Sequence, residues 1–258
     1  GEALEPKALK LTNLRDLPRA ALVAAPRLKA EALSCPSCGR PWQLHDAGIL
    51  AVACPGCGTL SDIDGKIAKV RDAARSGSTI TPPLPLGSRG KLAGQQWEVI
   101  GYLRKSTVGE VGADWDEYLL YDGEGGFSWL ASERGHWNFI RQLNGQPDSS
   151  RFGGQDVRVK GEEFQHFASY TGEVSFVLGE FTWRVAVGEQ VEVTDYIAPP
   201  SILSREKSAS ELTWSRGEYL PPEEISTAFG LKRSLLPPSG VNACQPNPYG
   251  GRRLSLLL

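Results

Sequence analysis

The sequence predicts a mainly β protein, because apolar and polar residues alternate over most of residues 86–235 while helical periodicity is scarce. Alternation with period two places one set of side chains on a buried sheet face and the other set on the opposite face. It appears in residues 97–104, 115–121, 127–131, 174–178, 181–187 and 191–197. We therefore expect an antiparallel β-barrel or sandwich with few short helices.

A glycine-rich turn and a proline-led helix interrupt this pattern. Residues 123–126 lie between two expected strands and lack the lysine and following helix of a phosphate-binding loop, so they predict a hairpin turn. Pro221 and Pro222 precede two glutamates, and Gly230 follows the last apolar residue of the stretch. Proline at the start and glycine at the end predict a short helix between them.

A weak internal repeat within residues 86–235 indicates a duplicated β unit. Trp97 and Trp183 each open a cluster of strands, and a second tryptophan follows them after 32 and 31 residues respectively. An acidic residue followed by tyrosine lies within each half, at 117–118 and 195–196. Because the tryptophans fall on the apolar face of the expected strands, we interpret them as core anchors.

Four of the five cysteines form two copies of one motif, separated by fifteen residues. Zinc needs four tetrahedral ligands, and a two-residue gap lets one tight turn present two sulfurs to the same metal. Glycine follows each pair, where a positive φ turns backbone N–H groups toward the sulfurs. The pattern predicts one structural Zn²⁺ ion in a zinc ribbon, with no open position for catalysis. Its ligands are Cys35, Cys38, Cys54 and Cys57.

Two disulfides or free core cysteines are the alternative, which paired CxxC motifs in a chain without an export signal disfavour. A β-hairpin over residues 41–53 is expected to join the two cysteine turns, with His45 on its surface. Cys244 stands alone in a stretch rich in Pro and Gly, and we interpret it as an incidental thiol.

Composition divides the chain into five expected segments. Apolar residues recur at helical spacing from Ile63 to Val70, and a proline cluster at residues 81–85 follows them. The expected segments are a leader (1–32), the zinc ribbon (33–62), a short helix with a Pro-rich linker (63–85), the β-rich domain (86–235) and a tail (236–258).

The tail suggests a membrane anchor. The chain contains no run of about 18 apolar residues and no basic-then-apolar signal at its start. Its last residues are apolar and directly follow Arg252 and Arg253, an order typical of the cytoplasmic side of a membrane-spanning helix. We expect the natural protein to continue past Leu258 into such a helix, and a simple soluble end is the alternative.

The charge balance argues against nucleic acid as the main partner. Residues 1–78 hold 11 Lys and Arg against 8 Asp and Glu, a net charge of +3, and the rest holds 17 against 22, a net charge of −5. Proteins that bind through phosphate neutralisation present a much denser basic surface.

Several motifs resemble those of bacterial proteins that carry the domain of unknown function 4178. They are Trp97-Glu-Val-Ile-Gly-Tyr102, Trp115-Asp-Glu-Tyr-Leu-Leu-Tyr121, Gly135-His-Trp137, Gly179-Glu-Phe-Thr-Trp183, Asp195-Tyr-Ile-Ala-Pro-Pro200 and Trp214-Ser-Arg-Gly-Glu-Tyr219. Similar proteins often carry an amino-terminal zinc ribbon and continue into transmembrane helices. The resemblance implies a membrane-stress system at the cytoplasmic face of the inner membrane, with membrane proteins or phage-shock-protein-A-like proteins as partners. It assigns no catalytic residue.

Three functions stay open at this point. The first, which we favour, is a non-catalytic, membrane-tethered interaction or scaffold protein with a protein partner. The second is an enzyme or small-molecule-binding protein that uses polar residues of the β domain, although the chain has no known catalytic motif. The third is a nucleic-acid-binding ribbon that uses the basic residues within 66–75. The candidates for the second function are His136, Asp116, Glu117 and Glu180.

Overall fold

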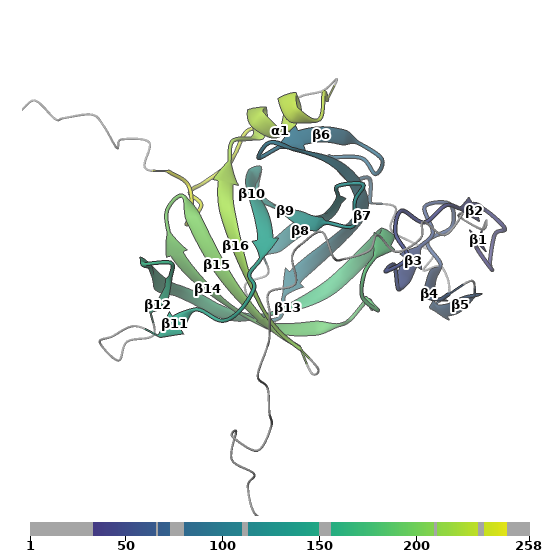
Figure 1. Cartoon of the computed structure of the whole chain (residues 1–258), viewed down its shortest axis with the longest axis horizontal. Helices are drawn as coiled ribbons and strands as arrows, with labels where there is room; N and C mark the ends of the chain where they lie inside the picture. Colours follow the sequence, from purple (N-terminus) through teal and green to yellow (C-terminus); the bar gives the residue numbers. More distant parts are fainter. Residues whose placement is uncertain are drawn as a thin grey trace, which may run out of the picture. The chain divides into compact units, whose positions relative to one another are not determined.

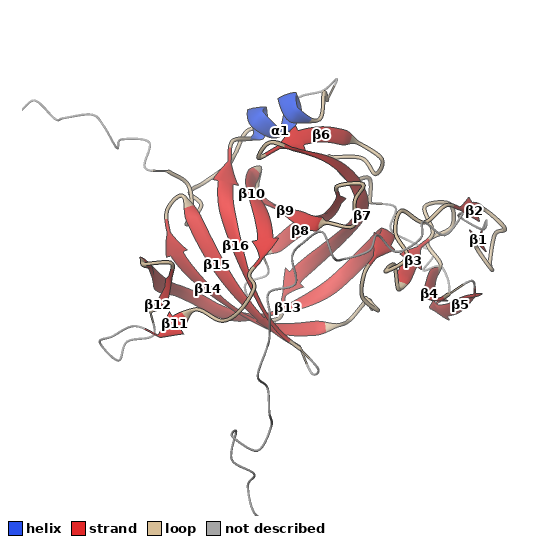
Figure 2. Cartoon of the chain, viewed as in Figure 1, coloured by secondary structure: helices blue, strands red, loops and turns tan. Residues whose placement is uncertain are grey.

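Strands make up most of the structure, and α1 (Pro222–Ala228) is the one α-helix in the part of the chain that is described (Figure 2). The computed structural model describes residues 33–65, 67–72, 80–109, 113–149, 156–208, 211–231 and 235–246. The expected leader and the last twelve residues of the tail lie outside these ranges. Helix α1 confirms the helix predicted from Pro221 and Gly230.

The strands fall into two groups along the chain. The cysteine-bearing segment, residues 33–72, which we call the ribbon, holds β1 (Leu33–Ser34), β2 (Pro41–Trp42), β3 (Ala51–Ala53), β4 (Leu60–Asp64) and β5 (Ile67–Asp72). The later strands are β6 (Arg89–Leu92), β7 (Gln95–Thr107), β8 (Asp114–Tyr121), β9 (Phe127–Glu133), β10 (His136–Gln142), β11 (Asp148–Ser149), β12 (Val157–Val159), β13 (Glu162–Phe181), β14 (Gln190–Ala198), β15 (Ser201–Lys207) and β16 (Leu212–Leu220).

Eight of the later strands close an antiparallel barrel, so the barrel is the correct one of the two expected architectures (Figure 1). β7 to β10 form one four-stranded meander, and β13 to β16 form a second. β10 pairs with β16 and β7 pairs with β13, which joins the two meanders along both sides. Closure leaves no unpaired edge within this ring of strands.

The two meanders repeat one topology, but the tryptophan spacing does not mark equivalent positions in them. Trp97 lies near the start of β7, whereas Trp183 follows the end of β13. The acidic-tyrosine pairs do correspond, because 117–118 lies on β8 and 195–196 lies on β14, the second strand of each meander. In both pairs the acidic residue lines the barrel interior, and the tyrosine packs in a buried cluster.

Strand β13 connects the barrel to the ribbon. Over its 20 residues it pairs in turn with β12, β14, β7 and finally β3. Gly179 is paired with Gly101 of β7 on one side and with Ala53 of β3 on the other. The ribbon strands β3, β4 and β5 therefore extend the sheet to which the barrel wall belongs.

The short helix expected from the spacing of Ile63 to Val70 is wrong. β4 and β5 form an antiparallel hairpin there, with Gly65 at a φ of +58° between them. Ile63 is buried, but Val70 is 50% exposed, so these two residues do not share one buried face. Asp64-Gly65 is a typical hairpin-turn sequence and was the local signal for this structure.

Two of the expected strand arrangements also need correction. Residues 41–53 do not form a hairpin with each other, because β2 pairs with β1 while β3 pairs with β4 and β13. The alternating residues 181–187 are not a strand beyond Phe181, and Val185 is buried within the loop that follows. Alternation could not separate strand from loop here because the loop also packs one side against the core.

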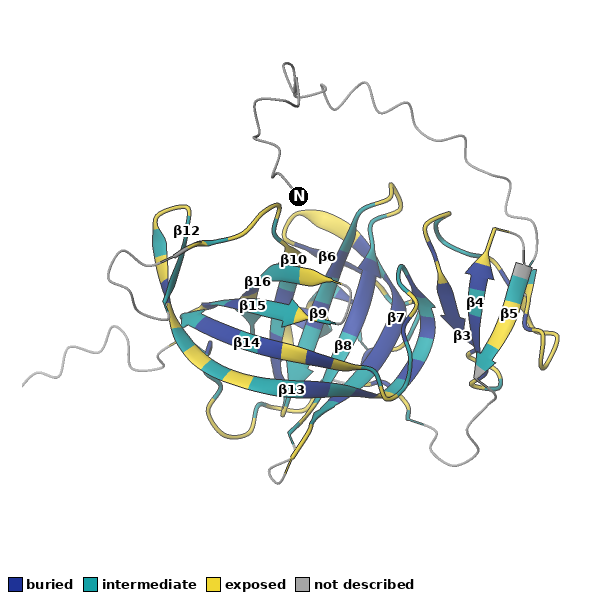
Figure 3. Cartoon of the chain, turned by 90° about the horizontal axis from the view of Figure 1, so that it is seen from below, coloured by how far each residue is buried: buried dark blue, intermediate teal, exposed yellow. Residues whose placement is uncertain are grey.

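A large apolar cluster covers the outer face of the first meander. Ile225 and Phe229, within and just after α1, pack there with Trp97, Tyr118 and Trp137. Leu84, in the proline cluster expected to be a linker, is fully buried in the same cluster. The stretch before the barrel is thus part of the core, and Figure 3 shows the buried stretches of β7 and β8.

We expect Gly179→Ala to destabilise the fold through backbone crowding where β13 leaves the barrel. A Cβ at Gly179 would lie 2.3 Å from the carbonyl oxygen of Ile100, and the φ of Gly179 is +86°. Gly188 is a matched control, because its φ is +87° and no atom lies within 4 Å of its Cβ position. Urea unfolding should show a loss of about 3 kcal/mol for Gly179→Ala and about 1 kcal/mol for Gly188→Ala. Equal losses would contradict the close approach.

Candidate metal centre and barrel cavity

Two matching turns carry the four cysteines. In the first turn, the N–H groups of Cys35 and Gly39 donate to the carbonyl oxygens of Arg40 and Cys35 at 2.8 and 2.9 Å. The second turn, at residues 54–59, repeats these two bonds at 3.0 and 2.8 Å. The glycine after each pair has a φ of +74°, a conformation that side chains with a Cβ rarely adopt.

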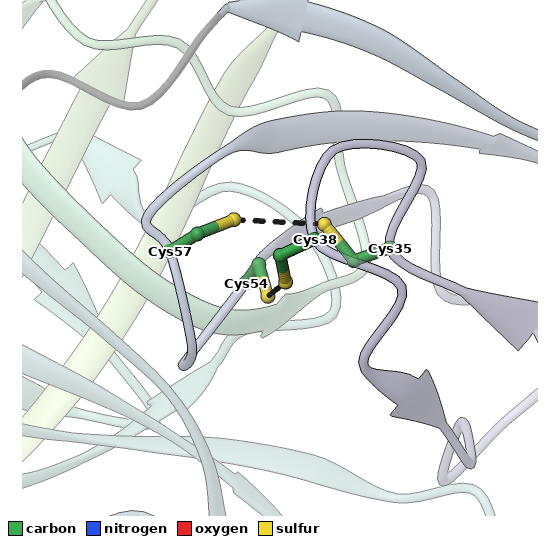
Figure 4. A group of neighbouring side chains, drawn as sticks. All are labelled: Cys35, Cys38, Cys54 and Cys57. Carbon is green, nitrogen blue, oxygen red and sulfur yellow. Dashed lines mark hydrogen bonds between the residues drawn. The ribbon is translucent and has the colours of Figure 1, made fainter.

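The four sulfur atoms lie within 4.8 Å of one another (Figure 4). Cys35 Sγ is 3.6 Å from Cys57 Sγ, and Cys38 Sγ is 3.7 Å from Cys54 Sγ. Tetrahedral bonds of about 2.3 Å to zinc would separate the sulfurs by about 3.8 Å, whereas a disulfide bond is about 2.05 Å long. All four cysteines are free, and their arrangement fits a Zn²⁺ ion held by four thiolates rather than two disulfides.

The thiols of Cys57 and Cys38 differ in acidity. Hydrogen bonding by the side chain and backbone of Thr59 lowers the pKa of Cys57 to about 6. The backbone of Arg40 lowers the pKa of Cys38, but neighbouring thiols and burial outweigh it and raise that pKa to about 11. A bound Zn²⁺ ion would stabilise all four thiolates, and its binding would release protons.

The two cysteine turns, residues 35–40 and 54–59, are called the metal turns from here on. They share one apolar cluster with the barrel. Cys35 and Cys54 are 2% and 0% exposed, and they pack in this cluster with Trp42 of the ribbon. Ile100 of β7 and Leu119 of β8 belong to the same cluster. The metal turns are thus packed against the barrel wall.

His45 also joins the ribbon to the barrel, rather than lying free on the surface as expected. Its backbone N–H donates to Glu180 Oε2 at 3.0 Å, and its Nδ1 lies 2.9 Å from Glu180 Oε1. Its Nε2 lies 3.3 Å from Glu98 Oε1. The hydrogen bond to Glu180 and the charges of both carboxylates outweigh burial and raise the pKa of His45 above 6.5.

The barrel holds a partly open cavity of about 770 Å³. Both meanders contribute inward-facing charged residues to its wall, namely Lys105 on β7, Glu117 on β8, Asp195 on β14 and Glu206 on β15. Indole rings and small residues such as Ala131 line it as well. A cavity of this size, with a few polar groups on a largely apolar wall, is typical of small-molecule sites.

A buried lysine lies between two glutamates in this cavity. Lys105 Nζ is 3.0 Å from Glu117 Oε1 and 3.3 Å from both carboxylate oxygens of Glu206. Trp115 Nε1 donates to Glu117 Oε1 at 2.7 Å. Burial lowers the pKa of Lys105, but the charges of the two glutamates outweigh it and raise that pKa, so the lysine stays protonated.

A second polar group lies around Asp195. Tyr170 Oη donates to Asp195 Oδ2 at 2.9 Å, and the hydroxyl of Ser204 donates to Asp195 Oδ1. Cys244 also lines the cavity and is 1% exposed. Burial, followed by the charge of Asp195, raises the pKa of Cys244 to about 12, so this thiol is a neutral part of the wall.

The four residues considered for an active site do not come together. Glu117 lines the cavity, whereas its neighbour Asp116 is on the other face of β8 and accepts a hydrogen bond from Arg104 at 2.8 Å. His136 is buried, with Nδ1 3.0 Å from the hydroxyl of a tyrosine on β16. Glu180 is at the junction with the ribbon.

Sequence reasoning missed the other charged residues of the cavity. Lys105 and Glu206 lie in polar stretches, residues 104–107 and 204–207, and Asp195 lies between Thr194 and Tyr196, a setting that usually marks a solvent-facing side. Barrel closure turns that side inward, and period-two alternation cannot reveal closure.

The basic residues considered for nucleic-acid binding are only partly described. Lys66 and Arg75 lie outside the described residues. Arg71 donates to the carbonyl oxygen of Arg184 at 3.1 Å and pairs with Asp62, so it is engaged within the protein. Within the described ranges, no helix is long and apolar enough to cross a membrane.

Comparison with known proteins gives one match. The sequence profile of the family described as Domain of unknown function (DUF4178) matches residues 85–222, more than half of the chain. The match covers all eight barrel strands and leaves the ribbon outside it. No curated protein and no solved structure matches the chain.

We expect the purified protein to hold one zinc ion per chain, measurable by elemental analysis, because four thiolates complete a tetrahedral site. The double variant Cys35→Ser/Cys54→Ser should lose the zinc, and the matched control Cys244→Ser should keep it. Unchanged zinc in the double variant would refute the ligand assignment.

Chelation of the zinc should lower the unfolding temperature of the barrel as well as that of the ribbon, because β3 pairs with β13 and the ribbon and barrel share a core cluster.

We expect the His45 contact to make stability depend on pH. The pKa of His45 is raised in the folded state, so its contribution is complete below about pH 6.5 and is lost as pH rises through the folded-state pKa. Between pH 6 and pH 8, with zinc kept saturating, the free energy of unfolding should fall by up to about 1 kcal/mol more in wild type than in His45→Asn. Identical pH profiles in urea unfolding would contradict this role.

Proposed function

The chain belongs to the DUF4178 family, and from this premise and the geometry of the barrel we propose that it is a non-catalytic binding protein. Its barrel takes a small molecule into the cavity, and its zinc ribbon is a structural part that also serves protein interaction. The observation that carries the proposal is the partly open barrel cavity of about 770 Å³, with charged side chains from both meanders.

The cavity wall has the composition of a binding site. Trp129 and Trp183 supply apolar surface, while Lys105 and Asp195 supply buried polar groups. Buried charges are costly to a fold unless they are paired, and replacing them with apolar residues often leaves stability unchanged or improves it. Their presence inside a barrel therefore supports a role in recognition rather than in stability alone.

The metal centre supports a structural role for the ribbon. Four thiolates fill the coordination sphere of zinc and leave no position for a substrate or an activated water. The separation of His136, Asp116, Glu117 and Glu180 gives no shared site at which two of them act on one reacting group. Both observations favour binding over catalysis.

We also propose a protein partner, in keeping with the interaction role expected from the sequence. β5 is at the end of the sheet order in the ribbon, and Val70 on this strand is 50% exposed. Extended peptides pair with sheet edges of this kind through backbone hydrogen bonds. A membrane segment beyond Leu258, a site at the cytoplasmic face of the inner membrane and phage-shock-protein-A-like partners rest on the resemblance and stay predictions.

A cavity-filling variant tests the binding function. Ala131 faces Glu117 on β8 and Asn138 on β10 in the sheet register, so Ala131→Trp should fill the cavity. Wild type incubated with a small-molecule extract of cells should retain a compound that native mass spectrometry detects. Ala131→Trp should retain at least about tenfold less, because the added ring displaces the ligand.

Ser175→Trp is the matched control, because Ser175 is an exposed residue of β13 outside the cavity wall. This control should retain the compound as wild type does, and circular dichroism should show all three proteins folded. Capture of the compound by Ala131→Trp at the wild-type level, or by no protein at all, would refute the proposed function.

A further inference from the structure

The cavity wall is short of positive charge. Among the described residues that line it, Lys105 is the one cation, and it faces the carboxylates of Glu117 and Glu206. Asp195 lines the same cavity and is hydrogen-bonded to hydroxyl groups rather than to a cation. One ammonium group and at least these three carboxyl groups therefore share the wall of the cavity.

The titration behaviour of these groups agrees with a negative interior. Burial, and then the charge of Glu206, raises the pKa of Glu117 in spite of Lys105. Burial also raises the pKa of Asp195, with Glu206 adding to the rise and hydrogen bonds from Ser204 and Tyr170 opposing it. A cation brought into the cavity would relieve this excess of negative charge.

One acceptor atom of a residue in the cavity wall also lacks a hydrogen-bond donor. Asn138 Oδ1, on β10, is buried and has no hydrogen-bond partner among the described residues. Asn138 lines the cavity and is next to Ala131 in register, which is itself next to Glu117. An unpaired buried acceptor costs free energy, so the interior beside the acidic groups is short of donors.

Aromatic rings border the acidic groups. Trp115 and Tyr170 both line the cavity and meet edge to face, with ring centroids 5.8 Å apart. Ring faces attract organic cations, and rings combined with carboxylates are the usual surroundings of bound ammonium groups. A metal ion fits less well, because the four cysteines are the one group of three or more such ligands close enough to hold a metal among the described residues.

We propose that the barrel cavity binds a small organic cation, with an ammonium group of the ligand held near Glu206 and Asp195. The inference rests on the proposed binding function and names the chemical class of the ligand. An anionic ligand would add to the carboxylate excess, and a neutral one would leave it uncompensated. The free volume of about 770 Å³ accommodates a linear or compact amine of several carbons.

Titration calorimetry with simple probes of matched length tests the charge of the ligand. The probes are 1,5-diaminopentane, 1,5-pentanediol and glutarate, which share a five-carbon chain and differ in charge. The diamine should bind at least about tenfold more tightly than the diol, and glutarate should show no binding, because only the diamine compensates the carboxylates. Ala131→Trp should abolish the diamine signal.

Two conservative variants locate the ammonium group. Glu206→Gln and Asp195→Asn should each weaken diamine binding by at least about fivefold, because each removes one charge-assisted contact. Glu192→Gln is the matched control, since Glu192 is exposed on β14 and pairs with Lys207 at 3.1 Å. It should change the affinity by less than twofold. Using both variants covers the case in which one of them does not fold.

The outcomes separate this inference from the function on which it rests. If the diol or glutarate binds as tightly as the diamine, or if both variants bind the diamine as wild type does, the cation inference is wrong. The barrel would still be a binding protein if Ala131→Trp loses the compound captured from the extract. Failure of that capture, together with no binding of any probe, would overturn both.

Discussion

The structure depends on the path of one strand, β13. Its middle pairs with β14 and β7 and so closes the barrel, and its last three residues pair with β3 of the ribbon. This double use requires glycine at the crossing, because the carbonyl oxygens of Ile100 and Glu180 occupy the space of a Cβ at Gly179 and Gly101. The metal turns therefore gain a fixed position on the barrel from backbone pairing.

Side chains of the ribbon and of the barrel also contact each other across this junction. Cys35 and Cys54 share an apolar cluster with residues of β7 and β8, and His45 contacts Glu180 and Glu98. A four-thiolate metal site alone would order only a short segment. Here the segment that holds the four cysteines also packs on the barrel, so a metal bound by them would contribute to the same cooperative structure that surrounds the cavity.

Barrel closure also determines the chemistry of the interior. The side of each strand that would face solvent in an open sheet lines a shared cavity instead, where Lys105 lies between carboxylates of β8 and β15 and a third carboxylate comes from β14. A charge that is buried in such a wall needs a partner. The protein supplies one lysine and several hydroxyl donors, and the remaining negative charge gives the cavity its preference among ligands.

Local chemistry in the sequence was enough to predict that four cysteines gather at one point, that strands dominate and that helix α1 forms. Ligand spacing, alternation and proline placement act over a few residues and need no knowledge of distant segments. The β4–β5 hairpin was missed although Asp64-Gly65 marked it, because apolar spacing was given more weight than turn chemistry. Only the tertiary structure decided between barrel and sandwich. It also brought Glu117 and Asp195 to the wall of one cavity and placed Glu180 against His45. Those outcomes depend on pairing between strands far apart in the chain, which local patterns do not encode.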